Sequence, residues 1–168
     1  MNLDLQTLED SFDLIAPRGE ELMDVFYERL FAAAPAVAPL FARSDLKHQK
    51  TKLLATLVLL RKSLRDLESI TPKLRQLGAK HVAYGAQPEH YPVVAEVLLA
   101  SMAEIAGDAW SPEIERAWTH ALVLVAAAMR EGARDAKAVA TSPAHRKPKP
   151  SRVSRTAATR LATAVWLV

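Results

Sequence analysis

The residue best placed to do chemistry is His81, which lies in the stretch Leu77–Tyr91. The imidazole of histidine is the commonest metal ligand in proteins. Leu77 precedes His81 by four residues, so on a helix both side chains lie on the same face. A nitrogen ligand on a rigid element beside an apolar slot could hold a metal ion or a metal-containing cofactor. Taken alone, a helical histidine is more often an ordinary core or surface residue, so its neighbours must decide.

The apolar residues recur at helical spacing along most of the chain, and this periodicity predicts the elements that position His81. No segment alternates as a strand would. Prolines stand where a first helical turn tolerates them, as in Thr71-Pro72 and Ser111-Pro112. We therefore predict an all-α fold of seven or eight unequal helices. The expected segments are 10–15, 20–31, 35–41, 47–67, 71–85, 88–102 and 111–129.

Composition bounds the class of protein. The 168 residues, half of them hydrophobic, suffice for one domain with a sizeable core. The absence of cysteine excludes disulfides, thiolate zinc sites and iron–sulfur clusters, and it fits a cytoplasmic location. The N-terminus lacks the basic start and apolar core of a signal peptide. No run approaches the roughly 18 apolar residues of a membrane span, so none is expected.

Charge divides the chain into two parts. Residues 1–133 carry 14 Lys and Arg against 18 Asp and Glu, whereas residues 134–168 carry eight against one. The high isoelectric point therefore belongs to the tail, and a nucleic-acid function is not expected for the folded part. We predict one domain over 1–133 and a basic, proline-containing, disordered tail over 134–168. The alternative for the tail is a weak contact with a membrane surface or nucleic acid through its arginines.

Residues 4 to about 133 resemble the single-domain bacterial haemoglobins and the globin domain of flavohaemoglobins. The resemblance is carried jointly by the pieces at 26–31, 40–41 and 88–91 and by five single positions. These positions are Pro35, Gln49, Leu53, Leu77 and His81. Fourteen residues separate Tyr27 from Phe41, and 32 separate Gln49 from His81, which match the family's spacing. No one piece is specific, but together they imply a globin fold around a haem pocket.

The resemblance implies that the chain binds haem b (iron protoporphyrin IX). His81 corresponds to the proximal ligand of the haem iron. Leu77 would pack against the porphyrin, and Phe41 would stack on it. Without the family spacing, Phe41 would be read simply as an aromatic residue of the core.

On the opposite, distal side of the haem, the resemblance implies two polar side chains. Tyr27 would donate a hydrogen bond to a bound gas molecule, an interaction that a dry pocket strengthens. Gln49 would be the second polar group, with Leu53 as an apolar wall one turn later. A shift of one residue would instead put His48 there, where it could bind iron as a sixth ligand. We prefer Gln49, because that register turns the following leucines inward.

Behind His81, the family carries a tyrosine and a carboxylate that increase the electron density on the histidine. Tyr91 matches the tyrosine. The carboxylate position falls on Asp135, a shorter acid than the family's glutamate, with Glu131 as a nearby substitute. Both acids could equally be solvated surface residues. The other histidines, His90 and His120 among them, have positions typical of exposed residues.

The resemblance leaves three functions open, and the main expectation is reversible binding of dioxygen. The first alternative is a nitric oxide dioxygenase, and the second is a haem-based gas sensor whose output contact is the tail. Nitric oxide and carbon monoxide are further expected ligands. The chain has no GxGxxG motif and no phosphate-binding glycine loop, so a dioxygenase would need an external reductase. A helical bundle without haem is the residual alternative.

Overall fold

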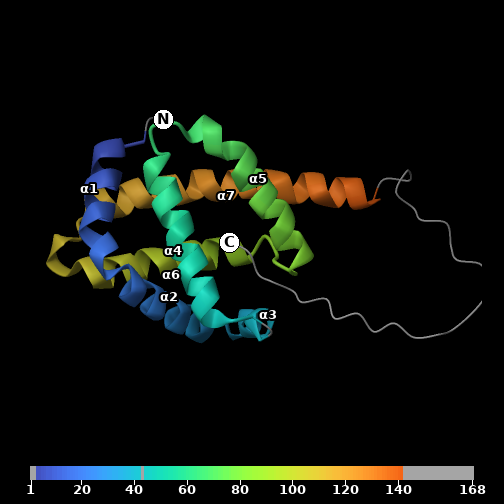
Figure 1. The fold of residues 1–168 in the computed structure, drawn as a ribbon, viewed down its shortest axis with the longest axis horizontal. Coiled ribbons are helices and arrows are strands. Elements are labelled where there is room, and N and C mark those ends of the chain that lie inside the picture. Colours follow the sequence, from blue (N-terminus) through green and yellow to red (C-terminus); the bar gives the residue numbers. More distant parts are fainter. Residues whose placement is uncertain (1–2, 43, 142–168) are drawn as a thin grey trace, which may run out of the picture.

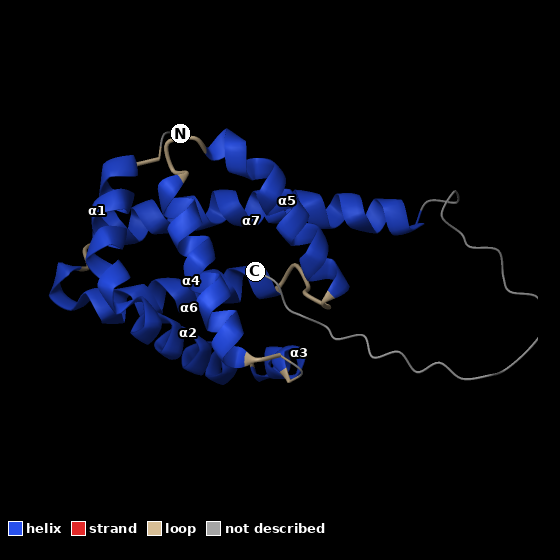
Figure 2. Cartoon of the chain, viewed as in Figure 1, coloured by secondary structure: helices blue, strands red, loops and turns tan. Residues whose placement is uncertain are grey.

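The computed structural model describes residues 3–42 and 44–141. All regular structure in these residues is helical, as Figure 2 shows. The α-helices are α1 (Leu5–Ile15), α2 (Gly19–Ala33), α3 (Ala38–Phe41), α4 (Leu46–Lys62), α5 (Leu67–Ala83), α6 (His90–Ala106) and α7 (Pro112–Thr141). Three 3-10 turns join them: η1 (Ala16–Arg18), η2 (Pro35–Val37) and η3 (Gly107–Ala109). The all-α prediction is confirmed. Six of these helices have 11 residues or more, and α3 has four, against the seven or eight expected.

Several helix ends differ from the prediction, among them the start of α1, at Leu5 instead of residue 10. The helix expected over 47–67 ends at Lys62, and the next begins at Leu67 instead of Thr71. The reason is Asp66, whose side chain accepts a hydrogen bond from the Ser69 N–H and so caps α5 one turn earlier. The last helix, α7, does not stop near the expected domain boundary at 133 but continues to Thr141. Residues 142–168, where most of the predicted tail falls, lie outside the described residues.

The helices pack so that α5 lies mainly on α7, and α2 lies on α6 and α4. Figure 1 shows α7 running across the molecule, with α5 crossing it and the end of α7 reaching past α5. Trp118 of α7 is fully buried beside Phe12 of α1, and its indole N–H donates to Ser11 Oγ at 2.9 Å. This contact joins the first and last helices through the core. No helix within the described ranges is long and apolar enough to span a bilayer.

The crossing of α5 and α7 brings their backbones into direct contact. A Cβ atom on Gly78 would lie 1.8 Å from the carbonyl oxygen of Met129, and one on Gly132 would lie 1.9 Å from that of Arg75. Any other side chain at either position would force the helices apart. Because His81 follows Gly78 by three residues, this crossing fixes where His81 lies.

Candidate functional site

A large cavity, open to solvent on one side, is lined by residues of α2, α3, α4, α5, α6 and α7. It measures about 1350 Å³, counting its open mouth, and most of its lining is apolar. A cavity of this size and lining is typical of a cofactor or ligand site. Seven residues that the sequence singled out line it together: Tyr27, Phe41, Gln49, Leu53, Leu77, His81 and Tyr91.

His81 reaches the cavity from the last turn of α5. Its Nδ1 lies 2.9 Å from the carbonyl oxygen of Leu77. A carbonyl can only accept, so Nδ1 carries the proton and the lone pair of the neutral ring is on Nε2. Burial lowers the pKa of His81, although the bond to Leu77 opposes this shift. The ring is therefore held in one orientation as a neutral imidazole, which is the form that binds metals.

Tyr27 reaches the cavity from α2 and is 3% exposed. Its ring packs edge-on against Phe26 and Phe41, with centroid separations of 5.1 and 5.7 Å. Burial raises the pKa of its phenol to about 12, so the group stays protonated and able to donate. Tyr27 lines the cavity opposite no charged neighbour, among the described residues, that would take its proton. A rigid donor is thus aimed at the cavity.

Gln49 reaches the cavity from the first turn of α4 and is 2% exposed. Its amide oxygen is buried and has no hydrogen-bond partner among the described residues. Such a group costs free energy until a donor meets it, so the position favours a ligand. His48, the alternative considered for this position, is exposed and does not line the cavity.

The two acids expected behind His81, Glu131 and Asp135, both lie on α7. Tyr91 lines the cavity, with a ring centroid 6.4 Å from that of His81. Burial raises its pKa, and the nearby positive charge of Arg130 opposes that shift. The carboxylate of Glu131, however, accepts hydrogen bonds from the Arg75 guanidinium at 2.5 and 3.1 Å. Asp135 is exposed on α7. The role of either acid behind Tyr91 therefore stays a prediction.

One residue at the cavity was missed by the sequence reasoning. His90, expected to be exposed, lines the cavity, and its Nδ1 accepts a hydrogen bond from the Gln87 N–H at 3.2 Å. Val94 and Leu98 follow it at intervals of four residues and also line the cavity. That spacing on α6 was the signal that could have placed His90 on the same face.

The donor set and the space agree with haem as the group held here. The cavity offers a neutral imidazole on α5, and a buried phenol and an orphaned amide oxygen on α2 and α4. Between them the walls are apolar, as a porphyrin requires. Haem held by His81 would leave its other face toward these two polar groups.

Comparisons with known proteins agree with this geometry. The family model described as Globin matches residues 24–129. The flavohemoprotein of Bacillus subtilis is 30% identical over 127 residues, which are 74% of this chain and 32% of that protein. The flavohemoprotein of Halalkalibacterium halodurans is 32% identical over 123 residues, 72% of this chain and 30% of that protein. The chain thus spans about a third of the length of these curated relatives.

Solved structures match over most of the chain. An engineered carbene transferase from Rhodothermus marinus, described as a proposed nitric oxide dioxygenase, superposes with a TM-score of 0.76 at 21% identity. The match covers 84% of this chain and all of that one. A bacterial globin from Campylobacter jejuni superposes with a TM-score of 0.69 at 22% identity, covering 80% and 96%. At these identities the matches establish the fold.

The chain belongs to the globin family, and its all-α architecture is the globin fold. Globins are haem proteins, and the globin domains of flavohemoproteins are its homologues.

Proposed function

We propose that this globin binds one haem b through His81 and reversibly binds dioxygen on the opposite face. When bound, haem supplies an iron atom with one position for an axial nitrogen and one for a diatomic gas. One observation carries the proposal: His81 and Tyr27 line the same cavity. The His81 ring is a neutral imidazole bonded to the Leu77 carbonyl, and the Tyr27 phenol is buried and protonated. The same pocket would accept carbon monoxide and nitric oxide.

On the distal side, Tyr27 and Gln49 do the work of selection. The Tyr27 hydroxyl would donate a hydrogen bond to a gas ligand whose oxygen carries partial negative charge, and the apolar surroundings would strengthen this bond. Its raised pKa keeps the proton on the phenol throughout the physiological range. The orphaned amide oxygen of Gln49 accepts from a protonated ligand, or its amide group turns to donate. Phe41 and Phe26 hold the phenol in place.

On the proximal side, the Leu77 carbonyl orients the His81 ring and fixes its tautomer. A carbonyl acceptor increases the basicity of the imidazole less than a carboxylate does. Glu131 on α7 is paired with Arg75, and Arg130 puts a positive charge near Tyr91. This arrangement favours reversible binding over oxygen activation.

The second candidate is a nitric oxide dioxygenase, the activity proposed for the Rhodothermus marinus protein. One nitric oxide and one dioxygen would combine, with one electron from an external reductase, to give one nitrate. The observation in its favour is that Tyr27 and Gln49 line the same cavity, which has space for both gases. Nitrate formation over many turnovers, in the presence of a reductase, would support this candidate over a carrier.

The remaining parts of the proposal concern the cellular location, the extent of the domain and the C-terminal tail. We place the protein in the cytoplasm on the strength of its lack of cysteine. Residues 1–133 would act as one domain. A third candidate is a haem-based sensor, in which the basic segment 134–168 would be the output contact.

The experiment is the dissociation rate of dioxygen from the ferrous haem protein, measured by stopped flow for the wild type and Tyr27→Phe. Loss of a buried hydrogen bond to a charged acceptor costs about 1.5–3 kcal/mol, so we expect dissociation to accelerate about tenfold or more. Tyr84→Phe is the matched control, because Tyr84 does not line the cavity. An unchanged rate in Tyr27→Phe would contradict the assigned role.

A further inference from the structure

We propose that a basic stripe on α7, formed by Arg130, Arg134 and Lys137, is the docking surface for an acidic electron-transfer protein. This inference rests on the proposed function, because the docked protein would keep the haem iron ferrous. One electron passes from the reduced partner to ferric iron, the partner is oxidised, and no bond is made or broken. Both candidate functions require ferrous iron.

The three cations of the basic stripe share one face of α7. They follow one another at intervals of four and three residues, which bring side chains to the same side of a helix. All three are exposed, and none forms an ion pair with any residue in the described ranges. Val123 and Ala127, which are also exposed, continue this face toward the start of α7. The surface therefore combines positive charge with a small apolar area, a composition that protein interfaces use.

The acids at this end of α7 leave the charge of the stripe largely uncancelled. The carboxylate of Glu131 is turned to α5, where it is paired with Arg75. Asp135 follows Glu131 by one turn and so shares that side of the helix. Within residues 3–42 and 44–141, Asp135 forms no ion pair with a cation of the stripe.

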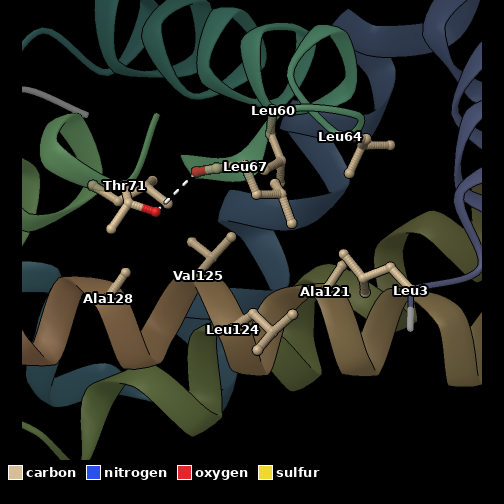
Figure 3. Close-up of a pocket in the computed structure, with 10 residues that line it drawn as sticks. Leu3, Leu60, Leu64, Leu67, Thr71, Ala121, Leu124, Val125 and Ala128 are labelled. Carbon is tan, nitrogen blue, oxygen red and sulfur yellow. Dashed lines mark hydrogen bonds between the residues drawn. The ribbon is translucent and has the colours of Figure 1, made fainter. Parts of the chain in front are cut away.

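Packing against other helices takes up the opposite side of α7. Figure 3 shows Ala121, Val125 and Ala128 pointing from α7 toward α4 and α5. At 3.6 residues per turn, the basic stripe lies on roughly the other side of the helix. Figure 1 shows the end of α7 reaching past α5, and residues 134, 135 and 137–140 are exposed there. The stripe is therefore accessible to a partner.

The stripe borders the proximal side of the main cavity. Ala126 and Met129 line that cavity, and Arg130 follows Ala126 by one turn of α7. The positive charge of Arg130 also lies close enough to Tyr91 to oppose the rise in its pKa. The ring centroid of Tyr91 lies 6.4 Å from that of His81. A protein docked on the stripe would thus lie beside the residue expected to hold the iron.

The distribution of charge selects an acidic partner. Residues 1–133 carry 18 acidic side chains against 14 basic ones, so most of the folded part repels such a protein. Residues 142–168, which follow α7 in the sequence, add six Lys and Arg and no acid. Positive charge therefore accumulates from the stripe onward, which would steer a negatively charged protein to this end of α7 and orient it there. The position beside the cofactor cavity favours a redox protein over other polyanions.

The first arm of the test measures binding. A bacterial flavodoxin, a small acidic flavoprotein, is added in its oxidised form to the 15N-labelled full-length protein, and amide shifts are recorded at low and high salt. We expect the largest shifts at residues 123–137 and their loss at high salt. Charge reversal by Arg134→Glu with Lys137→Glu should weaken binding about tenfold at low salt.

The second arm measures electron transfer. Reduced flavodoxin is mixed with the ferric haem protein under carbon monoxide, and the ferrous spectrum is followed by stopped flow. We expect the second-order rate constant to fall about tenfold in the doubly substituted variant, and the difference to vanish at high salt. Arg130 is left in place, because its charge acts on Tyr91.

The matched control reverses two cations elsewhere, by Lys62→Glu with Lys73→Glu. Lys62 of α4 and Lys73 of α5 are exposed and form no ion pair among the described residues. The net charge changes by the same amount as in the stripe variant. We expect the control to keep most of the binding and of the rate. A loss of equal size in both variants would mean that only the overall charge matters, and would overturn the proposal.

Two further results would overturn the inference. Binding and reduction that do not depend on salt would mean that charge does not guide docking. Loss of binding to phosphatidylglycerol vesicles or to duplex DNA in the stripe variant, with unchanged binding of flavodoxin, would assign the stripe to another polyanion. Haem uptake is measured first, so a protein without a haem spectrum reports failure of the proposed function, whereas the binding arm still tests the stripe.

Discussion

On the distal wall of the main cavity, the Gln49 amide oxygen is buried without a partner, and the Tyr27 hydroxyl faces open space. On the proximal wall, His81 Nδ1 lies 2.9 Å from the carbonyl oxygen of Leu77, the bond that orients its ring. Polar groups on the first wall await a ligand, whereas the imidazole on the second is tied to the protein. The contrast indicates that the proximal wall holds the His81 ring in a fixed orientation, whereas the distal wall recognises the ligand.

The largest loss of stability is expected from Gly78→Ala, which disrupts the close crossing of α5 and α7 that positions His81. The new methyl group would meet the Met129 backbone at 1.8 Å and must push α5 from α7. We expect a loss of about 3 kcal/mol of unfolding free energy, measured by urea titration, together with weaker haem retention.

The matched control for this change is Gly19→Ala. There the new Cβ atom meets only the side-chain end of Leu54, at 2.8 Å, in a normal helical conformation. A flexible leucine can move, and alanine favours helix over glycine by about 1 kcal/mol, so little stability should be lost. Equal effects from the two substitutions would mean that the α5–α7 crossing is not the constraint.

An intermediate effect is expected on the distal wall from Gln49→Leu. Removing a buried amide with an unpaired oxygen should stabilise the haem-free protein by about 1 kcal/mol, because the desolvation cost disappears. The same change should weaken ligand retention in the haem protein. Thermal unfolding of the haem-free protein checks the stability, and gas dissociation rates of the haem protein check the ligand retention. A lower stability of the haem-free variant would mean that Gln49 has a structural role.

The smallest effect is expected from Glu131→Gln. The Arg75–Glu131 pair is partly exposed, and such surface pairs contribute at most about 1 kcal/mol. Because the Glu131 carboxylate is paired with Arg75, we also expect no change in the iron–histidine stretching frequency measured by resonance Raman spectroscopy. A clear shift of that frequency would place Glu131 in the proximal site after all.

Much of the site could be predicted because it depends on spacing within helices. Leu77 with His81, and Gln49 with Leu53, share faces at intervals of four residues, and all four line the cavity. His90 was missed although Val94 and Leu98 repeat its face, because a histidine near a helix start is usually exposed. The placement of Glu131 could not be predicted, because it depends on Arg75 in a different helix.

In the fold, too, spacing along the chain predicted some features, whereas local caps and contacts between helices determined others. Periodicity and the prolines predicted the helices, but the start of α5 was wrong because the Asp66 cap outweighed Pro72 as a helix signal. Pro72 lies inside α5, where it removes one backbone donor from the early part of the helix. Side-chain caps and contacts between helices are set by tertiary packing, and spacing along one helix does not reveal them.

The most direct test is a haem titration followed by the visible absorption spectrum of the ferric, reduced and oxygen-exposed protein. The comparison is among the wild type, His81→Ala and, as the control, His48→Ala, which removes an exposed histidine outside the cavity. We predict a Soret band at one haem per chain and a stable oxygenated spectrum for the wild type and His48→Ala, both lost in His81→Ala. A wild type that takes up no haem, or a His81→Ala variant with an unchanged spectrum, would contradict the assignment of His81 as the iron ligand.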